Sequence, residues 1–78
     1  MSTYKPDYQR IADDLREQIA SQKLKPGDKL PSKRELREAY GTSAQPVDAA
    51  LFLLRAEGLI EGRQGKGTFV LGAREQHE

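Results

Sequence analysis

Hydrophobic residues recur at helical spacing in three segments of the chain, with polar residues between them. Spacings of three and four residues place apolar side chains on one face of a helix, which then packs against a core. Pro6 and Asp7 open the first helix, with Asp7 as its cap or first-turn acid, and we expect it to end between residues 21 and 23. Its apolar stripe consists of Tyr8, Ile11, Ala12, Leu15 and Ile19.

A second, shorter helix is predicted to begin after Ser32, which has the features of an N-cap. Glu35 follows three residues later, so Ser32 and Glu35 can form a capping box in which each side chain accepts a hydrogen bond from the other's backbone amide. Leu36 and Ala39 are expected to point inward, and Tyr40 to pack at the end of the helix.

A third helix is predicted beyond Gly41, a glycine that ends the second helix after about nine residues. Ser43 is its expected N-cap, and Pro46 is tolerated because its missing amide falls in the first turn. Since Pro46 has no amide to be capped, we expect Ser43 to cap the amide of Gln45. Gly58 ends the helix. Its buried stripe consists of Val47, Ala50, Leu51 and Leu54.

Two short apolar runs, at residues 59–61 and 68–71, predict an antiparallel hairpin around a tip at 62–67. Upstream, residues 25–28 have the pattern of a type II turn, and residues 29–30 leave room for only a very short strand. The predicted fold class is α+β, in the order α-β-α-α-β-β: three helices and a small antiparallel β-hairpin wing, the outline of a winged helix-turn-helix. This one domain would occupy residues 7–72, between a flexible arm at 1–6 and a flexible tail or linker stub at 73–78.

The composition supports one small globular domain. The chain has 78 residues and no cysteine, so its core must be stable without disulfides. Hydrophobic residues at 36% and charged residues at 32% are typical of a folded domain rather than of a disordered tail. No apolar run approaches the ~18 residues that cross a bilayer, and the N-terminus lacks a signal-peptide core. We therefore expect a cytoplasmic protein with no membrane partner.

The net charge of +1 favours no particular partner, but its distribution is more informative. Acidic residues gather on the first predicted helix. Between Lys29 and Arg37, four basic residues stand against one acid. A local excess of this kind can attract nucleic acid, although a solvated helix face would show the same pattern.

Catalytic chemistry finds little support in the sequence. His77, the one histidine, falls in the expected tail and has no evident partner for base or nucleophile work. The run Gly65-Lys66-Gly67-Thr68 lacks the full spacing of a phosphate loop and precedes a strand instead of a helix. No metal-ligand cluster is evident. We therefore expect no enzyme activity and no cofactor, metal or small-molecule site within this chain.

Two helices joined by a tight turn and followed by a basic hairpin are the elements with which winged helix-turn-helix proteins bind double-stranded DNA. The later helix, about residues 43–57, would enter the major groove, and the wing at 62–67 would lie at the adjacent backbone or minor groove. Arg34 could instead be a solvated partner of Glu38, and the wing glycines could serve only the turn. The candidate DNA-binding residues are Lys33, Arg34, Thr42, Ser43, Ala44, Gln45, Asp48, Arg63, Gln64, Gly65 and Lys66.

The longest motifs are Lys25-Pro26-Gly27-Asp28-Lys29-Leu30-Pro31-Ser32, Glu57-Gly58-Leu59-Ile60 and Gly65-Lys66-Gly67-Thr68-Phe69-Val70. Together with the helix stripes, they resemble the DNA-binding domain of GntR-family bacterial transcription regulators, over roughly residues 8–70. This resemblance implies a winged helix-turn-helix that binds operators as a homodimer. By position it implies DNA contacts from Arg34, from Ser43 and its neighbours, and from Gln64 and Gly65 in the wing.

Three departures from the family pattern bear on DNA recognition. Ala44 stands where the family commonly has arginine, and Asp48 where it has a basic residue, so the operator should differ from the usual family sequence, or binding should be weaker. Alanine could at most contact a thymine methyl, whereas aspartate could accept from a cytosine amino group. The third departure is the apolar pair Phe52-Leu53, which suggests a protein contact or a larger core, with the core role favoured for Leu53.

These departures leave an alternative function open, a winged-helix protein-interaction module that has lost DNA reading. Family members usually carry a C-terminal ligand-binding and dimerising domain, and the chain has no room for one. It is therefore expected to be either an excised domain or a small stand-alone regulator, and its self-association should be weak.

Overall fold

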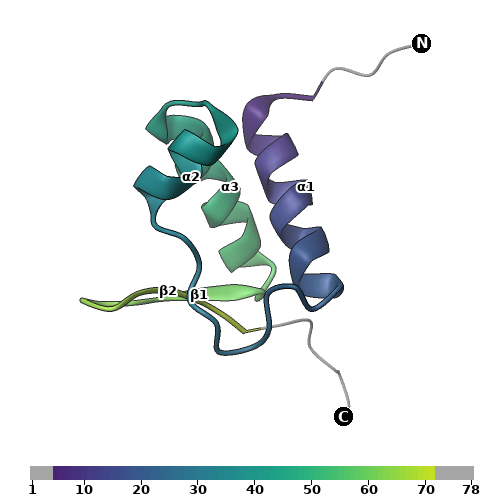
Figure 1. The fold of residues 1–78 in the computed structure, drawn as a ribbon, viewed down its shortest axis with the longest axis vertical. Coiled ribbons are helices and arrows are strands. Elements are labelled where there is room, and N and C mark those ends of the chain that lie inside the picture. The colour runs from purple at the N-terminus through teal and green to yellow at the C-terminus, as the bar shows by residue number, and fades with distance from the viewer. Residues whose placement is uncertain (1–4, 72–78) are drawn as a thin grey trace.

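The computed structural model describes residues 5–71 and places three helices above a two-stranded antiparallel wing (Figure 1). The elements are α1 (Asp7–Ala20), α2 (Lys33–Tyr40), α3 (Ala44–Ala56), β1 (Ile60–Arg63) and β2 (Gly67–Val70). The predicted winged helix-turn-helix is confirmed, and the helix bounds match the expected ones within a few residues. Residues 1–4 of the expected arm and the whole expected tail at 73–78 lie outside the described residues.

Helix α1 packs along α3 through the predicted stripe, with one exception. Ile11, Ala12, Leu15 and Ile19 are all buried. The prediction that Tyr8 faces the core is wrong, because its side chain is 39% exposed. Tyr8 lies in the first turn of α1, near the start of α3, where its ring borders a surface hollow with Ser43 and Pro46 instead of entering the core.

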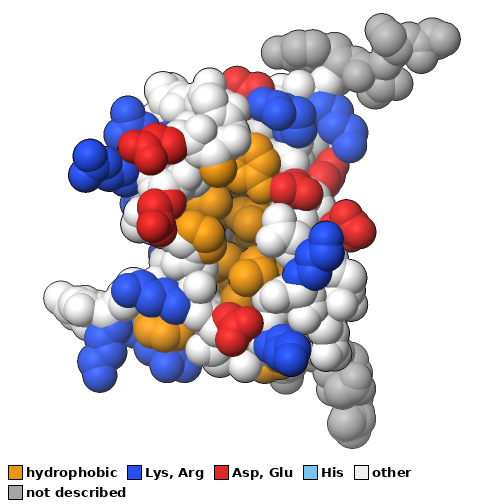
Figure 2. All heavy atoms as spheres, in the orientation of Figure 1, with side chains coloured by type: hydrophobic (Ala, Val, Ile, Leu, Met, Phe, Trp, Pro, Cys, Tyr) orange, Lys and Arg blue, Asp and Glu red, His pale blue; other side chains and the backbone are white. Residues whose placement is uncertain are grey.

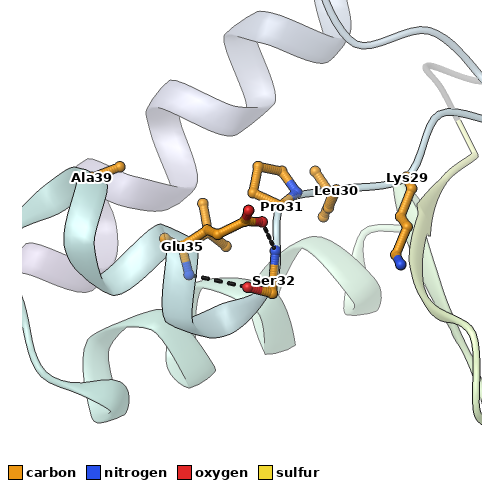
Figure 3. A pocket seen from close by; sticks show the side chains of 7 residues that line it. Lys29, Leu30, Pro31, Ser32, Glu35 and Ala39 are labelled. Atoms are coloured by element: carbon orange, nitrogen blue, oxygen red, sulfur yellow. Dashed lines mark hydrogen bonds between the residues drawn. The ribbon is translucent and has the colours of Figure 1, made fainter.

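Helix α2 begins with the predicted capping box. The Ser32 hydroxyl accepts from the amide of Glu35 at 3.1 Å, and the Glu35 carboxylate accepts from the amide of Ser32 at 2.8 Å (Figure 3). At the other end, Gly41 adopts φ +66°, the left-handed conformation in which glycine ends helices. The position and direction of this short helix are therefore set at both ends by local chemistry.

Fewer residues of α2 face the core than predicted. Leu36 is buried and Tyr40 packs against the core, but Ala39 is exposed, so its predicted inward orientation is wrong. Leu36 and Tyr40, four residues apart, already fill the contact with the core. The short Ala39 side chain instead lines an open hollow of about 590 Å³, in which Leu30 and Pro31 also lie (Figure 3).

Helix α3 buries its predicted stripe of Val47, Ala50, Leu51 and Leu54. Its C-terminus is a Schellman motif, because the amide of Gly58 donates to the carbonyl of Arg55 and that of Leu59 to the carbonyl of Leu54, each at 3.0 Å. Leu53 packs against the core, as favoured from the sequence, whereas Phe52 is 68% exposed.

The predicted side-chain cap at the start of α3 is wrong, since the Ser43 side chain makes no capping hydrogen bond. With Ser43 as the N-cap, the amide that such a side chain usually bonds belongs to the third helical residue. That residue is Pro46, which has no amide, and the Ser43 side chain does not cap the amide of Gln45 instead. The Ser43 hydroxyl is thus left exposed at the tip of the helix.

The wing is a two-stranded hairpin, and the chain at the upstream turn pairs with the edge of β2 that faces away from β1. Strands β1 and β2 pair Ile60 with Val70 and Arg63 with Gly67, so they extend further toward the tip than predicted. The type II turn is confirmed, with Gly27 at φ +92°. The short strand expected at residues 29–30 is a single bridge between Lys29 and Phe69. This pairing fixes the start of α2 relative to the wing.

A surface ion pair links α1 to the end of α3. The Arg16 guanidinium donates two hydrogen bonds to the Glu57 carboxylate, at 2.9 and 2.7 Å, and a third to Asp13. The contact with Arg16 lowers the pKa of Glu57 below its ordinary value. Exposed ion pairs of this kind contribute about 0–1 kcal/mol, so the buried stripes carry most of the stability.

Replacing Leu54 with alanine should therefore destabilise the domain strongly. The side chain is fully buried, and a large-to-small change at such a site costs ~2–5 kcal/mol. Urea unfolding followed by circular dichroism measures the change in the free energy of unfolding. Phe52→Ala, on the same helix but exposed, is the matched control and should change that free energy by no more than ~0.5 kcal/mol. Equal losses in the two variants would contradict this assignment of the core.

Tyr40 should ionise later than an ordinary tyrosine. Its partial burial, and then the hydrogen bond that its hydroxyl donates to Asp14, raise its pKa to about 12, because both favour the neutral phenol. Ultraviolet titration of tyrosinate, with circular dichroism at each pH to confirm folding, should show one late component. Tyr40→Phe should remove that component, and its persistence would contradict the assignment.

Candidate nucleic-acid interface

Exposed basic side chains from three separate elements line one groove between the wing and the start of α2. Figure 2 shows Lys and Arg side chains gathered at the edge beside α2 and on the wing, while hydrophobic side chains occupy the middle of that face and acidic ones are scattered around it. The groove has a volume of about 420 Å³. It is lined by Lys29, Leu30, Pro31, Ser32, Lys33, Leu51, Gly65, Lys66, Gly67 and Thr68.

At the start of α2, the capping box presents two predicted residues to solvent. Lys33 and Arg34 are the first two residues of the helix, directly after Ser32. The Arg34 side chain is 84% exposed, and its Nε lies 3.7 Å from the Glu38 carboxylate. The alternative partner considered for Arg34 is therefore present, but a long and exposed ion pair holds a guanidinium only weakly.

The start of α3 carries the predicted polar residues. Ser43, Ala44 and Gln45 are exposed, and Thr42 is half-buried. The hydroxyl of Thr42 donates to the carbonyl of Ser43 at 3.1 Å, which occupies it in the turn. The first amides of a helix have no intrahelical partners and carry partial positive charge, so this end of α3 suits the approach of an anion.

One turn further along α3, Asp48 is paired across the helix-turn-helix. Its Oδ1 lies 3.0 Å from Nζ of Lys33, and both side chains are more than half exposed. Two predicted site residues of opposite charge thus meet on the surface between α2 and α3. Both residues are predicted from the sequence, whereas their contact is not.

The wing presents its predicted residues in two different ways. Arg63 is held against the sheet, where Nε donates to Glu61 at 2.6 Å and the guanidinium lies 4.6 Å from the centroid of the Phe69 ring. Beyond it, the amide of Lys66 donates to the carbonyl of Arg63 and closes the turn, with Gly65 at φ +77°. Gln64, Gly65 and Lys66 project as the exposed tip.

Two basic residues that were not predicted as site residues join this surface. The aliphatic part of Lys29 lies over Gly67, where a Cβ atom would stand only 2.7 Å from its Cε. Arg55, on the exposed side of α3, approaches Gly62 of β1 with its guanidinium, whose Nη2 would stand 3.2 Å from a Cβ atom there. Lys29 was visible as part of the basic run, but its place beside the wing follows from pairing with β2, which no local pattern encodes.

Within residues 5–71, no group of three or more His, Cys, Asp or Glu side chains is placed to hold a metal ion. Among the helices of that same part, none is both long enough and apolar enough to cross a membrane.

The chain matches the family of bacterial regulatory proteins of the gntR type over residues 7–70. It is 43% identical, over 75 residues, to the mannosyl-D-glycerate transport/metabolism system repressor MngR of Escherichia coli, and 43% identical, over 65 residues, to the transcriptional repressor NagR of Bacillus subtilis. These matches cover 96% and 83% of this chain but 31% and 27% of the relatives, so the chain spans about a third of their length or less.

Two solved structures have closely similar folds. The DNA-binding domain of AraR, crystallised in complex with operator ORR3, superposes with a TM-score of 0.84 at 30% identity, over 90% of this chain and 84% of that one. A transcriptional regulator from Oenococcus oeni gives the same TM-score and identity, over 92% of this chain and 60% of that one.

Proposed function

The chain belongs to the GntR family of bacterial regulatory proteins, and we propose that it binds double-stranded DNA with sequence preference and thereby regulates transcription. The observation that carries the proposal is the shared groove, where cations from the turn before α2, from α2 itself and from the wing lie together beside α3. The superposition on the AraR domain in its operator complex supports the same use of the fold.

In the proposed complex, α3 lies in the major groove. A B-DNA major groove about 12 Å wide accepts one α-helix, and the exposed start of α3 would lead the approach. Ser43, Ala44, Gln45 and Asp48 then face base edges or phosphates. The wing tip at residues 64–66 would lie at the adjacent backbone or minor groove, since Gly65 lets its backbone approach closely.

The phosphate contacts would come mainly from Lys29, Arg34 and Lys66. Each phosphate neutralised releases condensed counterions, which makes the binding constant depend on salt. About three such contacts predict a slope near −3 when the logarithm of the binding constant is plotted against that of salt concentration. Such contacts position the protein but carry no sequence information, so preference must come from α3 and the wing.

We further propose that two copies bind a palindromic operator in the bacterial cytoplasm. A palindrome presents equivalent half-sites to a two-fold arrangement of helix-turn-helix domains. The relatives extend well beyond the matched region. In the proposed complex, dimerisation and effector binding depend on additional sequence of that kind. This chain alone should sediment as a monomer at micromolar concentration, and a tight dimer would contradict that expectation.

Fluorescence anisotropy of DNA duplexes titrated with the chain at several salt concentrations tests the proposal. Wild-type binding should weaken linearly with salt on logarithmic axes, and some duplexes should bind more tightly than others at fixed salt. Arg34→Ala and Lys66→Ala should each weaken binding to all duplexes and reduce the slope by about 1.

Lys23→Ala is the matched control, because Lys23 is an exposed lysine after the end of α1 and lines no part of the groove. It should leave both affinity and slope close to wild type, while circular dichroism confirms that every variant is folded. A folded chain that binds no duplex even at low salt would contradict DNA binding and favour the protein-interaction module, for which exposed Phe52 offers a contact. Unchanged affinity in both test variants would remove Arg34 and Lys66 from the interface.

A further inference from the structure

We propose that Asp48 is a specificity-determining residue, which favours a cytosine at one position of the DNA site, and that Lys33 holds it for this purpose. The inference rests on the proposed DNA binding and deepens it. It starts from one contact, the ion pair of 3.0 Å between Lys33 Nζ and Asp48 Oδ1.

Asp48 lies on the side of α3 that faces away from the core. Ala44, Asp48 and Phe52 follow one another at intervals of four residues and are all exposed, opposite the buried stripe. Asp48 is thus one turn behind the tip of the helix, within reach of base edges once that tip enters the groove. Ala44, with a single methyl group, leaves the space in front of the carboxylate open.

Lys33 is well placed to orient this carboxylate. It is the first residue of α2, and the capping box anchors its backbone directly after Ser32. Across residues 5–71, Lys33 is the one ion-pair partner of Asp48 and approaches Oδ1, which leaves Oδ2 available to an outside donor. The carboxylate is therefore directed without being fully occupied.

The chemistry of the major groove selects the base. Cytosine presents its N4 amino group there as a donor, which a carboxylate accepts, whereas guanine O6 and N7 and thymine O4 are acceptors that would repel it. Adenine offers the N6 amino group but places the acceptor N7 beside it. A carboxylate at this position should thus prefer cytosine.

Lys33 also resolves the electrostatic conflict that an aspartate creates beside DNA. An unpaired carboxylate near phosphates would weaken binding to every sequence. Here Asp48 lies in a shallow groove that Lys33 and Arg55 also line, so cations from two helices offset its charge. A role in stability alone explains the ion pair poorly, because both side chains are more than half exposed and such pairs contribute little.

The test selects preferred duplexes from a randomised library and then measures affinity for each single base-pair change at fixed salt. Wild type should discriminate against replacement of one cytosine by about tenfold. Asp48→Ala should lose preference at that position and keep it elsewhere. Asp48→Asn should move the preference there toward adenine, because an asparagine amide pairs with adenine N6 and N7.

Lys33→Ala should weaken binding to all duplexes, and Asp48→Ala in the same chain should recover part of that loss, since it removes the unpaired carboxylate. Glu38→Ala is the matched control, an exposed acid that is also in an ion pair, and should leave every base preference unchanged.

The outcomes separate this inference from the function on which it rests. A wild-type chain that binds all duplexes equally would contradict sequence preference itself. A wild type with clear preferences that Asp48→Ala and Asp48→Asn leave untouched would overturn the role of Asp48 alone. A uniform gain in affinity in Asp48→Ala, with no change at any single position, would show that Asp48 only repels phosphates and would also overturn it.

Discussion

The structure depends on the way α3 divides its 13 residues between two tasks. Its inner face supplies Val47, Ala50, Leu51 and Leu54 to a core that has no disulfide to support it. Its outer face is exposed and is the face that meets DNA in the proposed complex. Because the core is small, it needs the buried residues that α3 supplies along its length. The exposed positions of α3 are those that the buried stripe does not occupy. The spacing of the apolar residues therefore determines which side chains are available to contact DNA in the proposed complex.

Local chemistry then fixes how α3 is presented. The capping box at Ser32 and the left-handed Gly41 bound α2 within eight residues, so the turn into α3 begins at a defined point. The absent amide of Pro46 leaves the Ser43 hydroxyl without the capping contact it would otherwise make. At the far end, the Schellman motif at Gly58 turns the chain directly into β1. The wing is then positioned by its pairing with residues 27–30 on one edge.

The features that the sequence predicts well are those encoded within a few neighbouring residues: the buried stripe of α3, the capping box, the glycine ends and the type II turn. One error is local, the side-chain cap expected from Ser43, and the other two concern packing over longer distances. Tyr8 and Ala39 have the right spacing for burial, but the elements that would have to cover them are too short or lie elsewhere. The same limit applies to the interface, since Lys29 beside Gly67 and Lys33 beside Asp48 are contacts between separate elements.

The distribution of ion pairs explains how a chain with a net charge of +1 can present a basic surface. On α1 the acids meet nearby donors: Asp7 contacts Arg10, and Asp13 contacts both Lys5 and Arg16. These pairs offset part of the acidic charge of α1. Salt screens electrostatic interactions beyond ~8 Å at physiological ionic strength. Because the molecule extends 40 × 35 × 20 Å, the charges of α1 act only weakly on groups at its far side. The cations of α2 and the wing are less completely balanced, so a DNA phosphate approaching there meets the local excess of positive charge rather than the average.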